Sequence, residues 1–175
     1  MINFLRKHKV LTILSSIALA LVLIAVFAGR AIGNAAIEQY SQFRDRNKTV
    51  CTVNPKNGTQ IEYEGTLYQI LNKPVPDAQL GGWNGVFRKI AVLDGQCRVL
   101  KEVKADVDSA SQVAELKKHL PQGAKYVVTY FTVFSIKKTD EHSAVAVGLD
   151  KGMFQAVPVS KVTKNEPAVQ FRPDN

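Results

Sequence analysis

The chain is short of the residues and motifs on which most enzymes, metal proteins and transporters depend. Its 175 residues include two cysteines, one tryptophan and two methionines. It contains no G-x-S-x-G elbow, Walker loop, dinucleotide fingerprint or H-E-x-x-H pair. Only one apolar run approaches membrane-spanning length, which excludes a polytopic transporter or channel. The same run excludes a plain soluble cytosolic enzyme.

That apolar run covers residues 10–28 and holds no charge. At about 1.5 Å of rise per residue it gives roughly 28 Å of helix, near the thickness of a bilayer core. Three bases and no acid precede it: Arg6, Lys7 and Lys9. The positive-inside rule then predicts a cytoplasmic stub at 1–9, a transmembrane signal-anchor helix at 10–28 and an exported remainder. A cleaved signal peptide is the alternative, because Val26-x-Ala28 is an acceptable cleavage site.

This topology predicts a single-pass protein of a bacterial inner membrane, with the bilayer as the partner of the anchor and a periplasmic or otherwise exported domain. The chain carries 23 bases and 15 acids, a net charge of +8. The bases are dispersed and no basic motif is interleaved with aromatics, so no nucleic-acid partner is predicted. Sequons at Asn47 and Asn57 matter only in a eukaryotic secretory pathway.

Residues 29–46 are predicted to continue the helix as a juxtamembrane stalk. Tyr40 and Phe43 lie at helical spacing on one apolar face, which packs on its own domain or contacts a partner. Small residues recur every four positions at Ala25, Gly29 and Gly33. This small-xxx-small pattern is typical of helix–helix contacts. A homodimer is therefore an alternative to contacts with other envelope proteins.

The pattern of strands and one helix in residues 47–161 predicts an exported α+β domain. In this domain one helix packs on a face of a small, mostly antiparallel sheet. A flexible tail is expected at 162–175. Asn57-Gly58 and Asp94-Gly95 indicate hairpin turns. The expected strands are 49–53, 60–71, 86–93, 96–103, 125–136, 143–149 and 153–159, with a loop at 72–85. A capping box at 109–112 begins the helix.

In the segment 125–136 the even-numbered and the odd-numbered positions are both largely apolar. Both faces of a strand there would be apolar, which predicts a central strand covered on both sides. Strict alternation places Val128, Tyr130 and Phe134 on one face. It places Phe131 and Val133 on the other.

Cys51 and Cys97 are the only cysteines, and the exported compartment would be oxidising, so the sequence predicts a disulfide between them. Chain entropy would make it worth about 4 kcal/mol. Zinc ligation with His119 and His142 lacks the spacing of a compact zinc module, and no metal or cofactor is predicted. A Cys–His nucleophile would need a free thiolate in a compartment that favours disulfides.

Two further positions are candidate sites. Trp83, the only tryptophan, lies in a glycine-rich loop, which is typical of a partner anchor; a plug of the core is the alternative. Glu62 and Glu64 share one face of a strand about 7 Å apart, a spacing found in inverting glycosidases. Two acids at this spacing usually lie on the solvated face of an antiparallel sheet, so no catalytic residue is predicted.

With no catalytic set of residues, the favoured function is a non-enzymatic, bitopic subunit of a bacterial envelope assembly of the secretion, conjugation, pilus or division type. One alternative is a phage- or plasmid-encoded membrane protein acting in lysis, exclusion or virion structure. Another is a membrane-anchored enzyme acting on cell-wall glycan. All three rest on architecture, which constrains function weakly.

Overall fold

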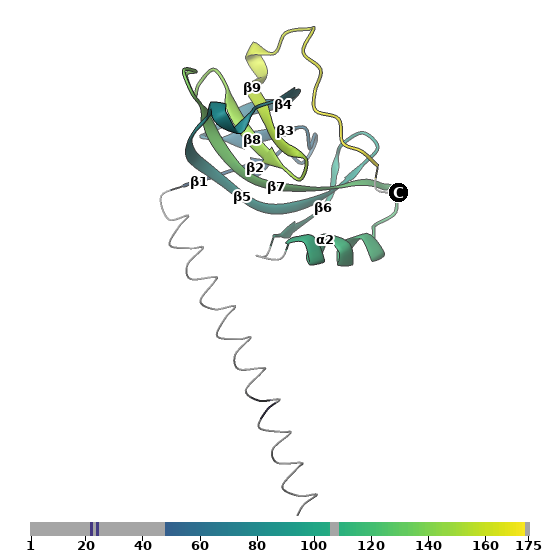
Figure 1. The fold of residues 1–175 in the computed structure, drawn as a ribbon. Helices are drawn as coiled ribbons and strands as arrows, with labels where there is room; N and C mark the ends of the chain where they lie inside the picture. The colour runs from purple at the N-terminus through teal and green to yellow at the C-terminus, as the bar shows by residue number, and fades with distance from the viewer. Residues whose placement is uncertain (1–21, 23, 25–47, 106–108, 174–175) are drawn as a thin grey trace, which may run out of the picture. The chain divides into compact units, whose positions relative to one another are not determined.

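A computed structural model describes Val22, Ile24 and residues 48–105 and 109–173 (Figure 1). The chain divides into two compact units, Met1–Arg46 and Asn47–Asn175. In the first unit, Val22 and Ile24 are helical with exposed side chains. The rest of the predicted stub, anchor and stalk lies outside the described residues. Within the described ranges, no helix combines the length and the apolar character needed to cross a membrane.

The described part of the second unit is built mainly from strands. The strands are β1 (Thr49–Val50), β2 (Thr52–Val53), β3 (Gln60–Tyr63), β4 (Thr66–Pro74), β5 (Leu80–Asp94), β6 (Val99–Lys104), β7 (Ala124–Ile136), β8 (Val145–Leu149) and β9 (Gly152–Pro158). The helices are α2 (Ser109–Lys118) and the short 3-10 helices η1 (Asp77–Gln79) and η2 (Val159–Lys161).

The two ends of the sheet meet at one short segment of chain. The strand order is β1-β5-β7-β8-β9-β4-β3-β2, with β6 paired to β5 beside this path. At one end β1 pairs with β5 in parallel, and at the other β2 pairs with β3 antiparallel. Only Cys51 separates β1 from β2, and its backbone N–H donates to the Val86 carbonyl at 2.9 Å. The sheet is therefore a nearly closed barrel, with residues 49–53 as its seam.

The predicted α+β class is wrong. The domain is mostly β, and α2 is a single short helix outside the barrel. The sequence predictions also missed one stretch of strand and one turn. The glycine-rich stretch predicted as the end of a loop is the beginning of β5, and the segment predicted as one strand over 60–71 is a hairpin of β3 and β4. Its turn has φ of 50° at Glu64 and 72° at Gly65, the signature of a type I′ turn.

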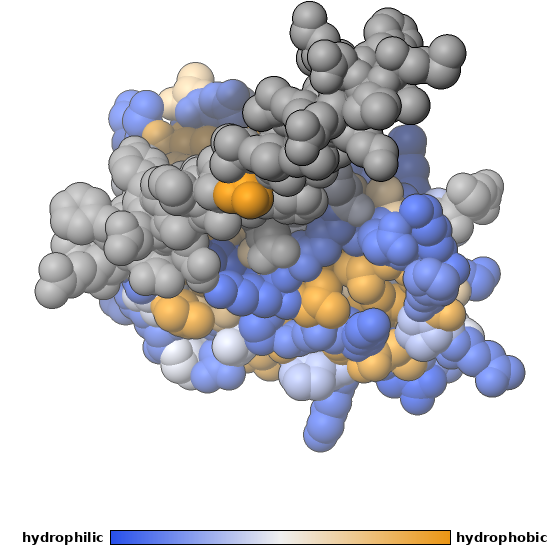
Figure 2. All heavy atoms as spheres, turned by 90° about the horizontal axis from the view of Figure 1, so that it is seen from below, coloured by the Kyte–Doolittle hydropathy of each residue, from blue (hydrophilic) through white to orange (hydrophobic). Residues whose placement is uncertain are grey.

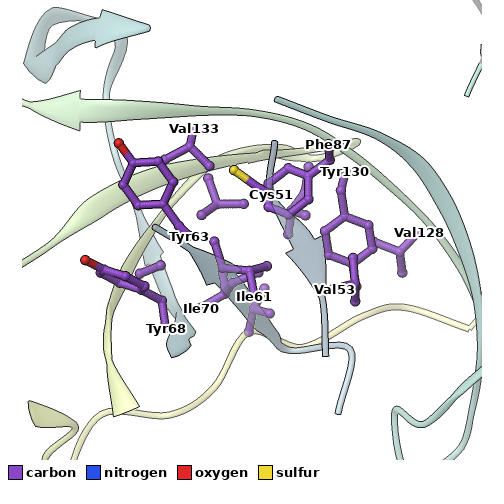
Figure 3. Packing of buried hydrophobic residues seen from close by; sticks show 14 of the residues in the cluster. Cys51, Val53, Ile61, Tyr63, Tyr68, Ile70, Phe87, Val128, Tyr130 and Val133 are labelled. Carbon is purple, nitrogen blue, oxygen red and sulfur yellow. The ribbon is translucent and has the colours of Figure 1, made fainter. Parts of the chain in front are cut away.

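Apolar side chains from seven strands fill the barrel (Figure 3). Tyr130 is fully buried, and its ring lies 5.7 Å from that of Phe87. Other members of this interior cluster are Cys51, Val53, Ile61, Tyr63, Tyr68, Ile70, Leu93, Val128, Val133, Val145 and Val147. Burial of this kind stabilises by about 25 cal/mol per Å² of apolar surface. The interior cluster is therefore the main source of stability.

A bulge in β7 overturns the predicted alternation of its side chains. Tyr130 pairs with Leu149 and Val133 with Val147, so Phe131 and Thr132 together oppose one residue of β8. An extra residue in one strand shifts the alternation beyond it. Val133 consequently joins Val128 and Tyr130 inside the barrel. Phe134 lies in a separate cluster, and Phe131 is 40% exposed.

Helix α2 covers part of the outer face of the barrel. Val113 and Leu116 pack against a small cluster formed by Ile90, Val92 and Val127 of β5 and β7. No residue of α2 is fully buried. The helix begins where the capping box predicted it (Figure 1). It lies on the outside of the barrel and contributes no fully buried residue.

Part of the predicted flexible tail is packed on the barrel. The Asn72 N–H donates to the Pro167 carbonyl, and the Val169 N–H to the Ile70 carbonyl, each at 2.9 Å. Val169 is buried in the interior cluster, and the Phe171 ring lies 6.1 Å from that of Tyr126. The segment was predicted to be flexible because its composition is polar. It nevertheless contains one buried valine, Val169, and pairs through its backbone with β4.

Candidate functional site

The structure does not bring the two cysteines together. Both are free thiols. Cys51 lies in the seam beside Val86, whereas Cys97 lies in the turn after Asp94, eight residues further along β5. At about 3.3 Å per residue this separation along the strand far exceeds the 7 Å limit for a disulfide. The predicted disulfide is not formed in this structure.

The Cys51 thiol is held in an apolar, tightly packed position. A Cβ on Gly85 would lie only 2.6 Å from the Cys51 sulfur, so the seam needs glycine at this place. Burial raises the pKa of Cys51 to about 12, although the backbone hydrogen bond with Val86 opposes the rise. A neutral thiol in such surroundings is inert, and Cys51 acts as a small apolar side chain.

Trp83 is tied to the place where the chain enters the seam. Its indole N–H donates to the Gly85 carbonyl at 2.8 Å. The Lys48 ammonium lies 5.0 Å from the ring centroid and also donates to the Trp83 carbonyl. The residue thus joins the beginning of β1 to β5. Its predicted role as a partner anchor stays a prediction.

One end of the barrel combines tyrosine hydroxyls with carboxylates. The rings of Tyr63 and Tyr68 pack edge to face with centroids 6.1 Å apart, and their hydroxyls point to the same side (Figure 3). The Tyr68 hydroxyl donates to the Glu141 carbonyl at 3.1 Å. Burial, followed by the negative charge of Glu64, raises the pKa of both tyrosines. Both therefore remain neutral hydrogen-bond donors at physiological pH.

Glu62 and Glu64 do not continue one regular strand. Glu64 lies in the type I′ turn with a left-handed backbone, while Glu62 remains in β3 opposite Thr52 and Leu67. The Thr49 hydroxyl donates to the Glu64 carboxylate at 3.4 Å. The glycosidase-like spacing assumed an unbroken strand, and the turn removes that assumption.

One hollow lies on the described part of the surface. A cavity of about 160 Å³ is lined by Val127, Val128, Asp150, Lys151, Phe171, Arg172 and Pro173. In the ranges that the structure describes, no group of three or more His, Cys, Asp or Glu side chains could hold a metal ion. The remaining predicted contacts, Tyr40, Phe43, Ala25, Gly29 and Gly33, lie outside the described residues.

Sequence reasoning missed the tyrosine pair as a local feature. Tyr63 and Tyr68 face each other only because the chain turns at Glu64-Gly65. The glycine in the middle of the predicted strand was the available signal, since glycine inside a strand often marks a turn or bulge.

These features define a small β-barrel protein with an interior filled by apolar side chains and two free thiols. The sequence model described as "Lantibiotic immunity protein Spa1 C-terminal domain" matches residues 53–156. The match covers more than half of the chain and extends from β2 to β9. The chain belongs to this family of lantibiotic immunity proteins.

Three solved structures are similar to part of this chain. The full-length, lipid-free form of NisI, the nisin immunity protein of Lactococcus lactis, is 18% identical with a TM-score of 0.48, covering 66% of this chain and 50% of NisI. The C-terminal domain of NisI is 19% identical with a TM-score of 0.45, covering 63% of this chain and 98% of that domain. The lantibiotic immunity protein SpaI is 18% identical with a TM-score of 0.43, covering 63% and 83% respectively.

This chain spans half the length of full-length NisI. Comparison with curated protein sequences gives no significant match.

Membership of this family corrects the functional prediction. The chain is not a subunit of a secretion, conjugation, pilus or division assembly, and neither the phage or plasmid alternative nor the glycan-cleaving alternative matches. The predicted localisation, a single-pass inner-membrane protein with a periplasmic domain, is corrected with it. Both predictions came from the arrangement of an apolar run and a small domain, and unrelated proteins share such arrangements.

Proposed function

We propose that this chain confers immunity against a lantibiotic, a peptide antibiotic, by binding the peptide without catalysing a reaction on it. The family match over residues 53–156 carries this proposal, because it covers nearly the whole barrel. The matched family is named for immunity, and binding is the simplest way in which a small barrel could protect a cell from a peptide.

The filled barrel supports recognition on the outside of the domain. Buried apolar side chains occupy the interior of the barrel, and the described hollow of about 160 Å³ is smaller than the 300–1,000 Å³ of typical small-molecule sites. On the face seen in Figure 2, apolar side chains occur in small areas separated by hydrophilic ones. A peptide would therefore bind across a mixed surface and not within a cleft.

An immunity assay tests the proposal. The full chain is produced in a lantibiotic-sensitive bacterium, and growth is measured against a panel of lantibiotics that includes nisin. We expect the inhibitory concentration of at least one lantibiotic to rise while that of a pore-forming peptide without lanthionine stays unchanged. Titration calorimetry with the same lantibiotic then measures binding, and mass spectrometry of the recovered peptide should show it intact.

Two variants show whether protection depends on the folded barrel. Tyr130→Ala removes a fully buried ring and should abolish protection. Leu100→Ala truncates a side chain that is 42% exposed and should leave the fold intact, which makes it the control for expression. Equal sensitivity of cells with and without the chain to every lantibiotic tested would refute the proposal. A chemically altered peptide would refute its non-catalytic part.

A further inference from the structure

The loop between β2 and β3 is clamped against the barrel through Gly58. The Gly58 N–H donates to the Cys97 carbonyl at 2.6 Å. The Gly58 carbonyl accepts a hydrogen bond of 2.5 Å from the hydroxyl of Tyr130, which is itself fully buried. Gly58 is buried as well, so both of its backbone groups are bound and shielded from water.

The acceptor of the Gly58 N–H is held in place by its own turn. The Cys97 N–H donates to the Asp94 carbonyl at 3.1 Å. The Asp94 carboxylate accepts from the N–H groups of Gln96 and Arg98, each at 2.8 Å, and from the Arg98 guanidinium at 2.7 Å. Burial acts to raise the pKa of Asp94, but the hydrogen bonds from Arg98 and Gln96 outweigh it and lower the pKa. The turn therefore stays charged and ordered at neutral pH.

The residue before Gly58 is an asparagine whose side chain is also held. The Asn57 Oδ1 accepts from the Thr59 N–H at 3.0 Å and from the Thr59 hydroxyl at 2.7 Å. Such local bonds are typical of asparagine in turns. Asparagine followed by glycine is the pair most open to attack by the backbone on the side chain, because glycine has no Cβ to obstruct the approach.

We propose that Asn57 is a site of spontaneous deamidation that the clamp on Gly58 keeps unreactive in the folded domain. In the reaction the Gly58 nitrogen loses its proton and forms a bond to the Asn57 Cγ, while the Cγ–Nδ2 bond breaks and ammonia leaves. Water then opens the resulting succinimide at either carbonyl and gives aspartate or isoaspartate. The reaction needs no oxidant, reductant or cofactor.

The clamp blocks the first step. The Gly58 nitrogen cannot lose its proton or turn toward the Asn57 side chain while its N–H is bound to Cys97. Deamidation therefore requires a local opening of the loop, and the frequency of that opening sets the rate. The product gains a negative charge, and isoaspartate also lengthens the backbone by one carbon. A lengthened loop does not fit again, because Gly58 already packs so closely on Leu93 that a Cβ would lie 2.8 Å from its side chain.

The test compares the folded and unfolded chain. The full-length protein in mild detergent is incubated at mildly alkaline pH with and without urea, and peptide mapping by mass spectrometry follows Asn57. We expect conversion in the folded chain to be slower by about tenfold or more, because a buried, doubly hydrogen-bonded amide opens rarely. Equal rates in both samples, or no conversion in urea, would overturn the proposal.

Two matched tyrosine variants isolate the clamp. Tyr130→Phe removes the hydroxyl that binds the Gly58 carbonyl, whereas Tyr68→Phe removes a buried hydroxyl that binds Glu141 elsewhere. We expect faster conversion in folded Tyr130→Phe and the wild-type rate in folded Tyr68→Phe. Circular dichroism confirms that each variant is folded before its rate is read. If the two folded variants react alike, the Tyr130 hydroxyl does not hold the loop closed and the proposed clamp is wrong.

Discussion

Tyr130 and Phe131 are neighbours in β7, but one is fully buried and the other is 40% exposed. Tyr130 lies inside the barrel, packs on Phe87 and donates to the Gly58 carbonyl. Phe131 lies at the bulge, where two residues of β7 oppose one of β8. The difference shows that apolar character alone does not set burial, since both residues are large aromatics in the same strand.

The same contrast separates the inside and outside of the whole domain. Interior side chains are surrounded by a nearly closed sheet, whereas Val113 and Leu116 of α2 are only half-buried against the outer face. Stability should therefore reside mainly inside, which leaves the outside tolerant of change. A tolerant outer surface suits a protein whose proposed task is binding.

The largest contrast is expected between truncations of the two neighbouring aromatics. Tyr130→Ala should lower the free energy of unfolding by about 3–5 kcal/mol, through a cavity and an unpaired Gly58 carbonyl. Phe131→Ala should cost less, about 1 kcal/mol, because the residue is 40% exposed and lies outside the interior cluster. Urea unfolding followed by circular dichroism measures both. Similar losses would mean that the bulge does not separate the two environments.

A smaller effect is expected at the seam. Gly85→Ala should cost about 1–3 kcal/mol, because the added methyl would lie 2.6 Å from the Cys51 sulfur. Gly95→Ala is the control, since its nearest side-chain atom, on Lys125, would lie 3.7 Å away. Adding Cys51→Ala to Gly85→Ala should recover part of the loss in thermal melts. No recovery would show that the strain lies elsewhere.

The outer face should respond more weakly still. Leu116→Ala in α2 should cost about 1 kcal/mol, because the side chain is half-buried and the helix can settle on the barrel. Leu116→Met, which keeps the volume, should be near neutral. A loss from Leu116→Ala as large as that from Tyr130→Ala would show that α2 belongs to the core.

The two thiols should differ in reactivity with little change in stability. Near neutral pH, a thiol reagent should label the half-buried Cys97 first and Cys51 only after unfolding. Burial raises the pKa of Cys51 to about 12 from an ordinary value of 9.0. The stability that its neutral thiol contributes is therefore present below about pH 9 and is lost as the pH rises toward 12. Unfolded chain that resists labelling until reductant is added would instead reveal the disulfide.

Local signals in the sequence located several elements of the barrel domain. The capping box fixed the start of α2, the Asp94-Gly95 turn separated β5 from β6, and the apolar segment 125–136 became β7. These succeeded because each depends on the chemistry of adjacent residues. Two of the site predictions were wrong: the cysteines are apart, and the spacing of Glu62 and Glu64 assumed a regular strand, whereas the chain turns at Glu64.

The sequence by itself determined which residues are apolar, where several turns fall and, through the match over 53–156, the family to which the chain belongs. Only the tertiary structure decided that the sheet closes through Cys51, that a bulge exchanges Val133 for Phe134 inside the barrel, and that Val169 returns to the core. Closure and register depend on pairing between residues far apart in the chain. A one-residue shift in pairing reverses the side of every following side chain, and no local pattern records it.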